Sequence, residues 1–71
     1  MSVAAVATIF GRVLGTPAEH DSDFFALGGD SRLATRVLSA IARESGVELT
    51  FDEFVAAPTP AGLAATVGGL R

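Results

Sequence analysis

The sequence predicts an all-α fold, a small bundle of three main helices and one short helix. Apolar residues recur at helical spacing in three separate segments, and capping residues or glycines mark where the segments begin and end. The chain has 71 residues, no cysteine and one histidine, so neither a disulfide nor a cysteine-based zinc site can stabilise its fold. We therefore expect residues 1–71 to form a single domain that is stabilised by helix packing and helix caps.

The first predicted helix spans residues 3–14. Ser2 is a suitable N-cap, and Gly15 is a suitable residue to end the helix. Arg12 falls opposite the apolar face, so the helix is expected to be amphipathic, with one face toward the core. The positions predicted to point inward are Val3, Val6, Phe10, Val13 and Leu14.

The segment of residues 16–30 lacks helical periodicity and is predicted to be a loop. It is rich in acidic residues and closes at Gly28–Gly29. A long loop in a small domain needs apolar anchors, so we expect Phe24, Phe25 and Leu27 to hold this segment to the core.

The second predicted helix spans residues 31–45, and Gly46 ends it. Arg32, Arg36 and Arg43 lie opposite the apolar face, where they point toward water or a partner. The inward positions of this helix are Leu33, Ala34, Val37, Leu38 and Ile41.

Two further helices complete the predicted bundle. Thr50 and Glu53 form a capping box that starts a short helix through Val55. Thr59–Pro60 supplies an N-cap and a proline at the first position of the last helix, while Pro58 prevents the two helices from merging. The last helix is predicted to turn Leu63, Val67 and Leu70 inward, and all five phenylalanines of the chain are expected in the core.

The charge balance narrows the classes of partner. The formal net charge is −3 at pH 7, and all five basic residues are arginines. A net acidic domain binds the phosphate backbone of nucleic acids poorly. The longest apolar stretch is interrupted by Arg12, far short of the ~18 residues that a membrane span needs, and no secretion signal is recognised. We expect a cytoplasmic monomer that binds neither nucleic acid nor membranes.

The turn before the second helix is the strongest candidate for a functional site. Gly28 and Gly29 keep the approach to the following side chains open, and Asp30 and Ser31 begin the helix. Ser31 thus offers a primary hydroxyl at a helix N-terminus, where unpaired N–H groups favour a nearby phosphate. A plain turn followed by an N-cap explains the same residues, and from spacing alone it is the commoner explanation.

The segment Asp23–Ser31 closely resembles the signature of peptidyl carrier (thiolation) domains of nonribosomal peptide synthetases. Its nine residues read Asp-Phe-Phe-Ala-Leu-Gly-Gly-Asp-Ser, and order and spacing agree with the family over about residues 6–67. The flanking elements that extend the likeness are Val13–Gly15, Leu33–Arg36, Phe54, Pro58–Thr59 and Leu63–Ala64.

The resemblance implies an acyl-carrier-protein-like fold and a 4′-phosphopantetheine arm attached to Ser31, with Gly28, Gly29 and Asp30 as motif neighbours. It implies a carrier with no catalytic activity of its own and no metal site. A phosphopantetheinyl transferase would modify Ser31 with coenzyme A, and an adenylation enzyme would load the arm with an aminoacyl group. The thioester would then pass to condensation, epimerisation, thioesterase or tailoring enzymes.

The resemblance also implies which residues meet these partners. In the family the second helix and the loop before it are the usual contact region, so Arg32 and Arg36 are expected to dock partner enzymes. Arg32 departs from the family pattern, because the residue after the modified serine is usually apolar. Arg43 lies far from Ser31 along the helix and is expected to be solvated.

Two alternatives remain open from the sequence, and a third is not expected. An acyl or aryl carrier of polyketide- or siderophore-type synthesis would share the fold, but such carriers commonly lack the Leu27–Gly29 run. A non-carrier helical interaction module would explain the helices and caps. Self-contained Ser catalysis is not expected, because Leu33 replaces the last glycine of Gly-x-Ser-x-Gly and His20 is the only available base.

Overall fold

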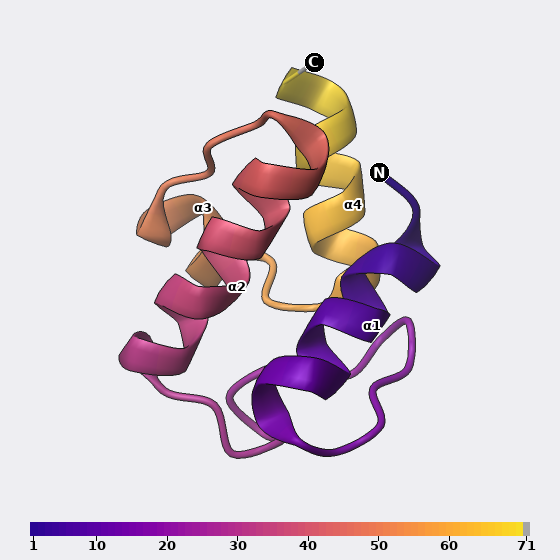
Figure 1. Cartoon of the computed structure of the whole chain (residues 1–71), viewed down its shortest axis with the longest axis vertical. Coiled ribbons are helices and arrows are strands. Elements are labelled where there is room, and N and C mark those ends of the chain that lie inside the picture. Colours follow the sequence, from indigo (N-terminus) through magenta and orange to yellow (C-terminus); the bar gives the residue numbers. More distant parts are fainter. Residues whose placement is uncertain (71) are drawn as a thin grey trace.

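The computed structural model describes residues 1–70 and contains four helices in that range (Figure 1). The three main helices are α1 (Val3–Leu14), α2 (Ser31–Ser45) and α4 (Pro60–Leu70), and the short helix is α3 (Phe51–Ala56). Residues 1–70 contain no strand, so the predicted all-α bundle is confirmed. Within this range no helix combines the length and the apolar character needed to cross a membrane.

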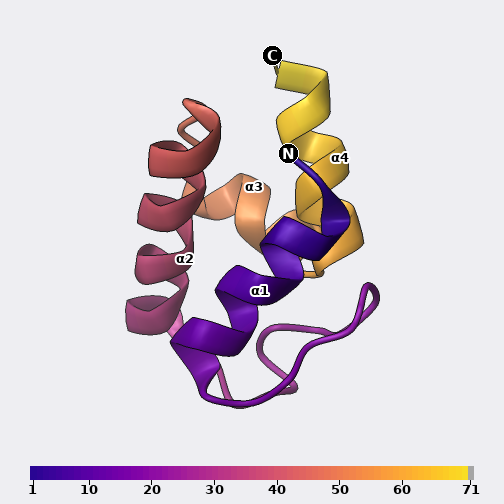
Figure 2. The ribbon, with the colours of Figure 1, turned by 45° about the vertical axis from the view of Figure 1, so that its right-hand side comes forward.

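Helix α1 holds the bundle together because it packs against both α2 and α4, while α3 packs on α2. In Figures 1 and 2 the loop between α1 and α2 passes around the C-terminal end of α1 before it reaches the start of α2. The position of this loop therefore decides where the N-terminus of α2 is presented.

The predicted caps occupy the helix ends. Ser2 Oγ accepts a backbone N–H bond of 3.0 Å at the start of α1. Thr50 and Glu53 form the reciprocal capping box of α3, with bonds of 2.9 and 3.1 Å. Gly15 and Gly46 end α1 and α2 with left-handed φ values of 71° and 76°, which glycine adopts without steric cost.

The start of α4 also follows the prediction. Pro60 is the first residue of the helix, where its missing N–H costs no hydrogen bond. Thr59 Oγ1 accepts a bond of 3.0 Å from the Gly62 N–H, and the Thr59 carbonyl accepts one of 2.9 Å from the Leu63 N–H. Thr59 therefore acts as the expected N-cap.

The core draws on all four helices and on both long connections. Its buried apolar residues are Val6, Ile9, Phe10, Phe24, Ala34, Val37, Ala40, Ile41, Leu49, Phe54, Leu63, Ala64 and Val67. Among these, Ile9, Ala40, Leu49 and Ala64 were not predicted to be buried. Six other residues predicted to point inward or to anchor the loop are only half-buried: Val3, Val13, Leu14, Leu27, Leu33 and Leu38.

Three side chains predicted to lie in the core are exposed, so these predictions were wrong. The exposed fractions are 36% for Phe25, 41% for Phe51 and 54% for Leu70. Phe51 begins a helix of six residues that buries Phe54 alone. Leu70 lies in the last turn of α4, which extends past the end of α1 in Figure 1.

Phe24 joins the loop to the core, as predicted. Its ring is fully buried and meets the rings of Phe10 and Phe54 edge to face, with centroid distances of 5.1 Å in both cases. Such aromatic pairs stabilise by about 0.5–1.5 kcal/mol each beyond the burial of their area. Phe25 packs on the outer side of this cluster, 5.5 Å from Phe24 and 6.0 Å from Phe54.

Substitution of Phe24 is expected to destabilise the protein much more than substitution of the adjacent Phe25. Phe24→Ala should lower the free energy of unfolding by about 3–5 kcal/mol, because it removes a buried ring and leaves a cavity. Phe25→Ala is the matched control and should lose only about 1–2 kcal/mol, since its ring already meets water. Urea unfolding followed by far-UV circular dichroism measures both.

Equal losses for the two variants would contradict the anchoring role of Phe24. Should Phe24→Ala not fold at all, Phe24→Leu retains part of the buried volume and is compared with Phe25→Leu in the same assay.

Candidate functional site

The turn that leads into α2 is organised by Asp23. Its Oδ1 accepts hydrogen bonds from the N–H groups of Phe25 and Ala26, at 2.9 and 3.1 Å. Its carbonyl accepts a further bond of 3.1 Å from the Leu27 N–H. Asp23 therefore closes the turn over residues 23–27.

The backbone of Phe24 ties this turn to the rest of the bundle at two points. Its N–H donates to the carbonyl of Pro58 at 2.8 Å, which links the turn to the connection before α4. Its carbonyl accepts from the Gly29 N–H at 3.0 Å, which brings the end of the loop back onto the same residue. The ring and the backbone of Phe24 thus position the chain immediately before Ser31.

The two glycines of the turn are required for different reasons. Gly28 has a φ of 97°, a conformation that residues with a side chain rarely adopt. Gly29 lies directly against Phe24: a Cβ atom built on it would overlap the Phe24 ring and would lie 2.7 Å from the Phe24 carbonyl oxygen. Gly29 is therefore a packing requirement of the loop.

Asp30 and Ser31 form the start of α2. Asp30 is the N-cap, with Oδ1 accepting from the Leu33 N–H at 2.9 Å, and its carbonyl accepts from the Ala34 N–H at 2.8 Å. Ser31 is the first helical residue and is exposed. The N-cap role of Asp30 is thereby confirmed, and the Ser31 hydroxyl is placed at the positive end of a helix of 15 residues.

This arrangement suits a hydroxyl that receives an anionic group. The first N–H groups of an α-helix have no partner within the helix, and together with the helix dipole they favour a phosphate close to the N-terminus. The backbone of His20 is bonded to the first turn of α4, where its carbonyl accepts from the Ala61 N–H at 2.9 Å. Residues 1–70 contain no cluster of three or more metal-ligating side chains.

The arginines of α2 separate into two groups. All three are exposed, as predicted. Arg36 and Arg43 line an open groove between α1 and α2, and Arg12 of α1 lies on its opposite side. Arg32 does not line this groove. The sequence places Arg12 on the outer face of α1. Only the packing of α1 against α2 shows that Arg12 lines the same groove as Arg36 and Arg43.

The fold and the site together define a carrier-type helical domain, in which a loop anchored by Phe24 presents an exposed serine at the start of the longest helix. The family model for the phosphopantetheine attachment site matches residues 4–67. The chain belongs to this phosphopantetheine-attachment family.

Curated relatives support the same family. The chain is 46% identical over 61 residues to pyochelin synthetase PchE of Pseudomonas aeruginosa, a match that covers 84% of this chain. It is 35% identical over 69 residues to enterobactin synthase component F of Escherichia coli O157:H7, covering 96% of this chain. The chain spans only 4% and 5% of the lengths of these two relatives.

Two solved structures share the fold. One is a complex of the phosphopantetheine transferase Sfp with coenzyme A and a peptidyl carrier protein, with a TM-score of 0.92 at 33% identity over 97% of this chain and 91% of that chain. The other is the solution structure of an active-site mutant of a peptidyl carrier protein, with a TM-score of 0.89 at 34% identity over 94% of this chain and 76% of that chain.

These similarities confirm the peptidyl carrier prediction: the chain is a carrier domain of the nonribosomal peptide synthetase type, and its cofactor is phosphopantetheine. They favour a carrier over a helical interaction module. The family also identifies the chain as a substrate of modification and not as a catalyst.

Gly29→Ala is expected to destabilise the protein by about 1–3 kcal/mol, because the added methyl group overpacks the Phe24 contact. Gly68→Ala is the matched control, since a Cβ at Gly68 meets nothing within 4 Å and the residue lies inside α4. That variant should gain up to about 1 kcal/mol from helix propensity. Urea unfolding gives the free energy of unfolding of both variants. An unchanged value for Gly29→Ala would contradict the packing role of Gly29.

Proposed function

We propose that Ser31 is the residue to which 4′-phosphopantetheine is attached, and that residues 1–71 form one carrier domain of nonribosomal peptide biosynthesis. The observation that carries this proposal is the exposed hydroxyl of Ser31 at the first position of α2, directly after a turn that has no bulky side chain at Gly28 and Gly29. The family of the chain supplies the chemical identity of the attached group.

The attachment requires a phosphopantetheinyl transferase and coenzyme A, the partners named for the similar solved complex. The Ser31 oxygen forms a bond to the phosphorus that bears the pantetheine. The bond from this phosphorus to the oxygen of the leaving phosphate breaks, and 3′,5′-adenosine bisphosphate departs. The hydroxyl proton passes to a base of the transferase.

The residues of this chain have three roles in that reaction. Gly28 and Gly29 leave the approach to the hydroxyl open, and Asp30 begins α2 so that Ser31 is its first residue. The N-terminal N–H groups of α2 then favour the phosphodiester that forms on Ser31.

Once attached, the arm supplies a terminal thiol that carries aminoacyl or peptidyl groups as thioesters. An adenylation enzyme loads it, and condensation, epimerisation, thioesterase or tailoring enzymes receive the group. Tethering raises the effective concentration of the group at each partner. We place the domain in the cytoplasm as a monomer, with Arg32 and Arg36 among the residues that dock these enzymes.

The attachment is tested by intact mass before and after incubation with coenzyme A, Mg²⁺ and a broad-specificity phosphopantetheinyl transferase. We expect the wild-type chain to gain one phosphopantetheine and Ser31→Ala to gain none. Ser39→Ala is the matched control and should be modified like the wild type, because it removes a hydroxyl from the middle of the same helix.

A folded wild-type protein that two different transferases leave unmodified would overturn the proposed attachment. Modification of Ser31→Ala would place the attachment on a different residue.

Charge reversal tests the docking role. Arg36→Glu should slow aminoacyl loading or transfer by at least one cognate enzyme about tenfold, because it replaces an attractive contact with a repulsive one. Its free energy of unfolding should change by less than about 0.5 kcal/mol, since the side chain is exposed. Unchanged loading and transfer by every cognate enzyme would rule out docking through Arg36.

A further inference from the structure

The surface between α1 and α2 carries an open groove of about 370 Å³. The apolar residues that line it are Ile9 and Ala40, which are 1% and 5% exposed, and the half-buried Val13, so Val13 supplies most of the apolar surface that a ligand reaches. Its rim is cationic, with Arg12 on α1 and both Arg36 and Arg43 on α2. The groove therefore combines an apolar base with positive charge on both sides.

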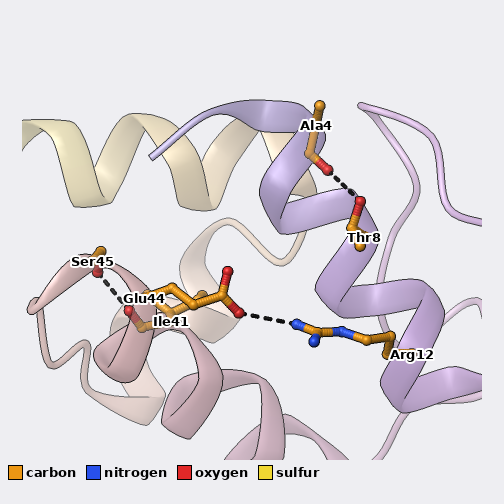
Figure 3. A network of polar contacts seen from close by, with 6 residues as sticks. All are labelled: Ala4, Thr8, Arg12, Ile41, Glu44 and Ser45. Carbon is orange, nitrogen blue, oxygen red and sulfur yellow. Dashed lines mark hydrogen bonds and ion pairs between the residues drawn. The ribbon is translucent and has the colours of Figure 1, made fainter.

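This concentration of positive charge is unusual for a chain with a net charge of −3. Within residues 1–70, neither Arg36 nor Arg43 has a carboxylate at ion-pair distance. Arg12 alone is paired: its guanidinium lies 3.0 Å from the carboxylate of Glu44, and Figure 3 shows this contact bridging α1 and the last turn of α2. The two side chains are 60% and 40% exposed, so water competes with the pair and the bond is readily exchanged.

We propose that this groove binds an acidic, amphipathic segment of a partner protein. The apolar residues of the segment face Ile9, Val13 and Ala40, and its carboxylates face Arg36 and Arg43. The contact between Arg12 and Glu44 shows how a carboxylate is held at this rim, and an incoming carboxylate replaces Glu44 there.

An acidic peptide segment fits the groove better than other polyanions do. A nucleic acid backbone gains nothing from the apolar floor, and the acidic loop residues Glu19, Asp21 and Asp23 repel it elsewhere on this small domain. Arg32, which does not line the groove, offers a charge-matched position for comparison.

The test is a titration of the unmodified, ¹⁵N-labelled chain, so its result does not depend on whether Ser31 carries an arm. The probe is a synthetic helical peptide with leucines along one face and glutamates on both flanks. The control probe has glutamine in place of every glutamate. We expect amide shifts confined to the facing surfaces of α1 and α2 with the glutamate peptide, and at least about tenfold weaker binding with the glutamine peptide.

Three variants localise the binding. Arg43→Glu should weaken it at least about tenfold, whereas the matched single reversal Arg32→Glu, on an exposed residue outside the groove, should weaken it less than about threefold. Glu44→Gln should tighten it about two- to fivefold, because it frees Arg12. Circular dichroism checks that each variant is folded.

Several results would overturn the proposal. They are shifts spread over the whole domain, equal losses in the two charge-reversed proteins, and equal binding of the two peptides. Self-association of the chain without peptide, abolished by the groove variant in sedimentation experiments, would assign the groove to a second copy of the chain instead.

Discussion

The position of Phe24 is the constraint on which the rest of this domain depends. Its ring fills the centre of the core between Phe10 and Phe54, and its two backbone groups bond to Pro58 and Gly29. One residue therefore connects α1, α3, the connection before α4 and the end of the loop. Because Ser31 follows only two residues after Gly29, the geometry of the proposed attachment site is set by hydrophobic packing at a distance from it.

A domain of 71 residues has little stability to spare, so its helix caps add usefully to the stability that its core supplies. Each main helix begins with a Ser, Asp or Thr side chain that accepts a backbone N–H bond. At α2 the cap also has a functional consequence, because Asp30 ends the loop where Ser31 becomes the first helical residue. The same local interaction stabilises the helix and presents the hydroxyl.

The charges of the chain are distributed over different surfaces. Acidic residues gather in the loop that precedes the Gly-Gly turn, whereas three arginines surround the groove between α1 and α2. A carrier that meets several enzymes in turn benefits from surfaces of different sign, since electrostatic complementarity governs which partner associates and how fast. In this domain the proposed attachment turn leads into α2, and the cationic groove runs along the same helix, so α2 carries two candidate surfaces for different partners.

The sequence by itself determined the helices and their caps, because these depend on residues three or four positions apart, and the resemblance of Asp23–Ser31 to peptidyl carrier domains indicated the candidate serine. Ser2, Asp30, Thr50 and Thr59 bond to N–H groups within their own first turns, so local spacing was sufficient. Only the tertiary structure decided which apolar residues are buried at the ends of helices, as Phe51 and Leu70 show. It also decided the contact of Gly29 with Phe24 and the meeting of Arg12 with Arg36 and Arg43. These contacts depend on the angle and register at which elements pack, and no local pattern encodes either.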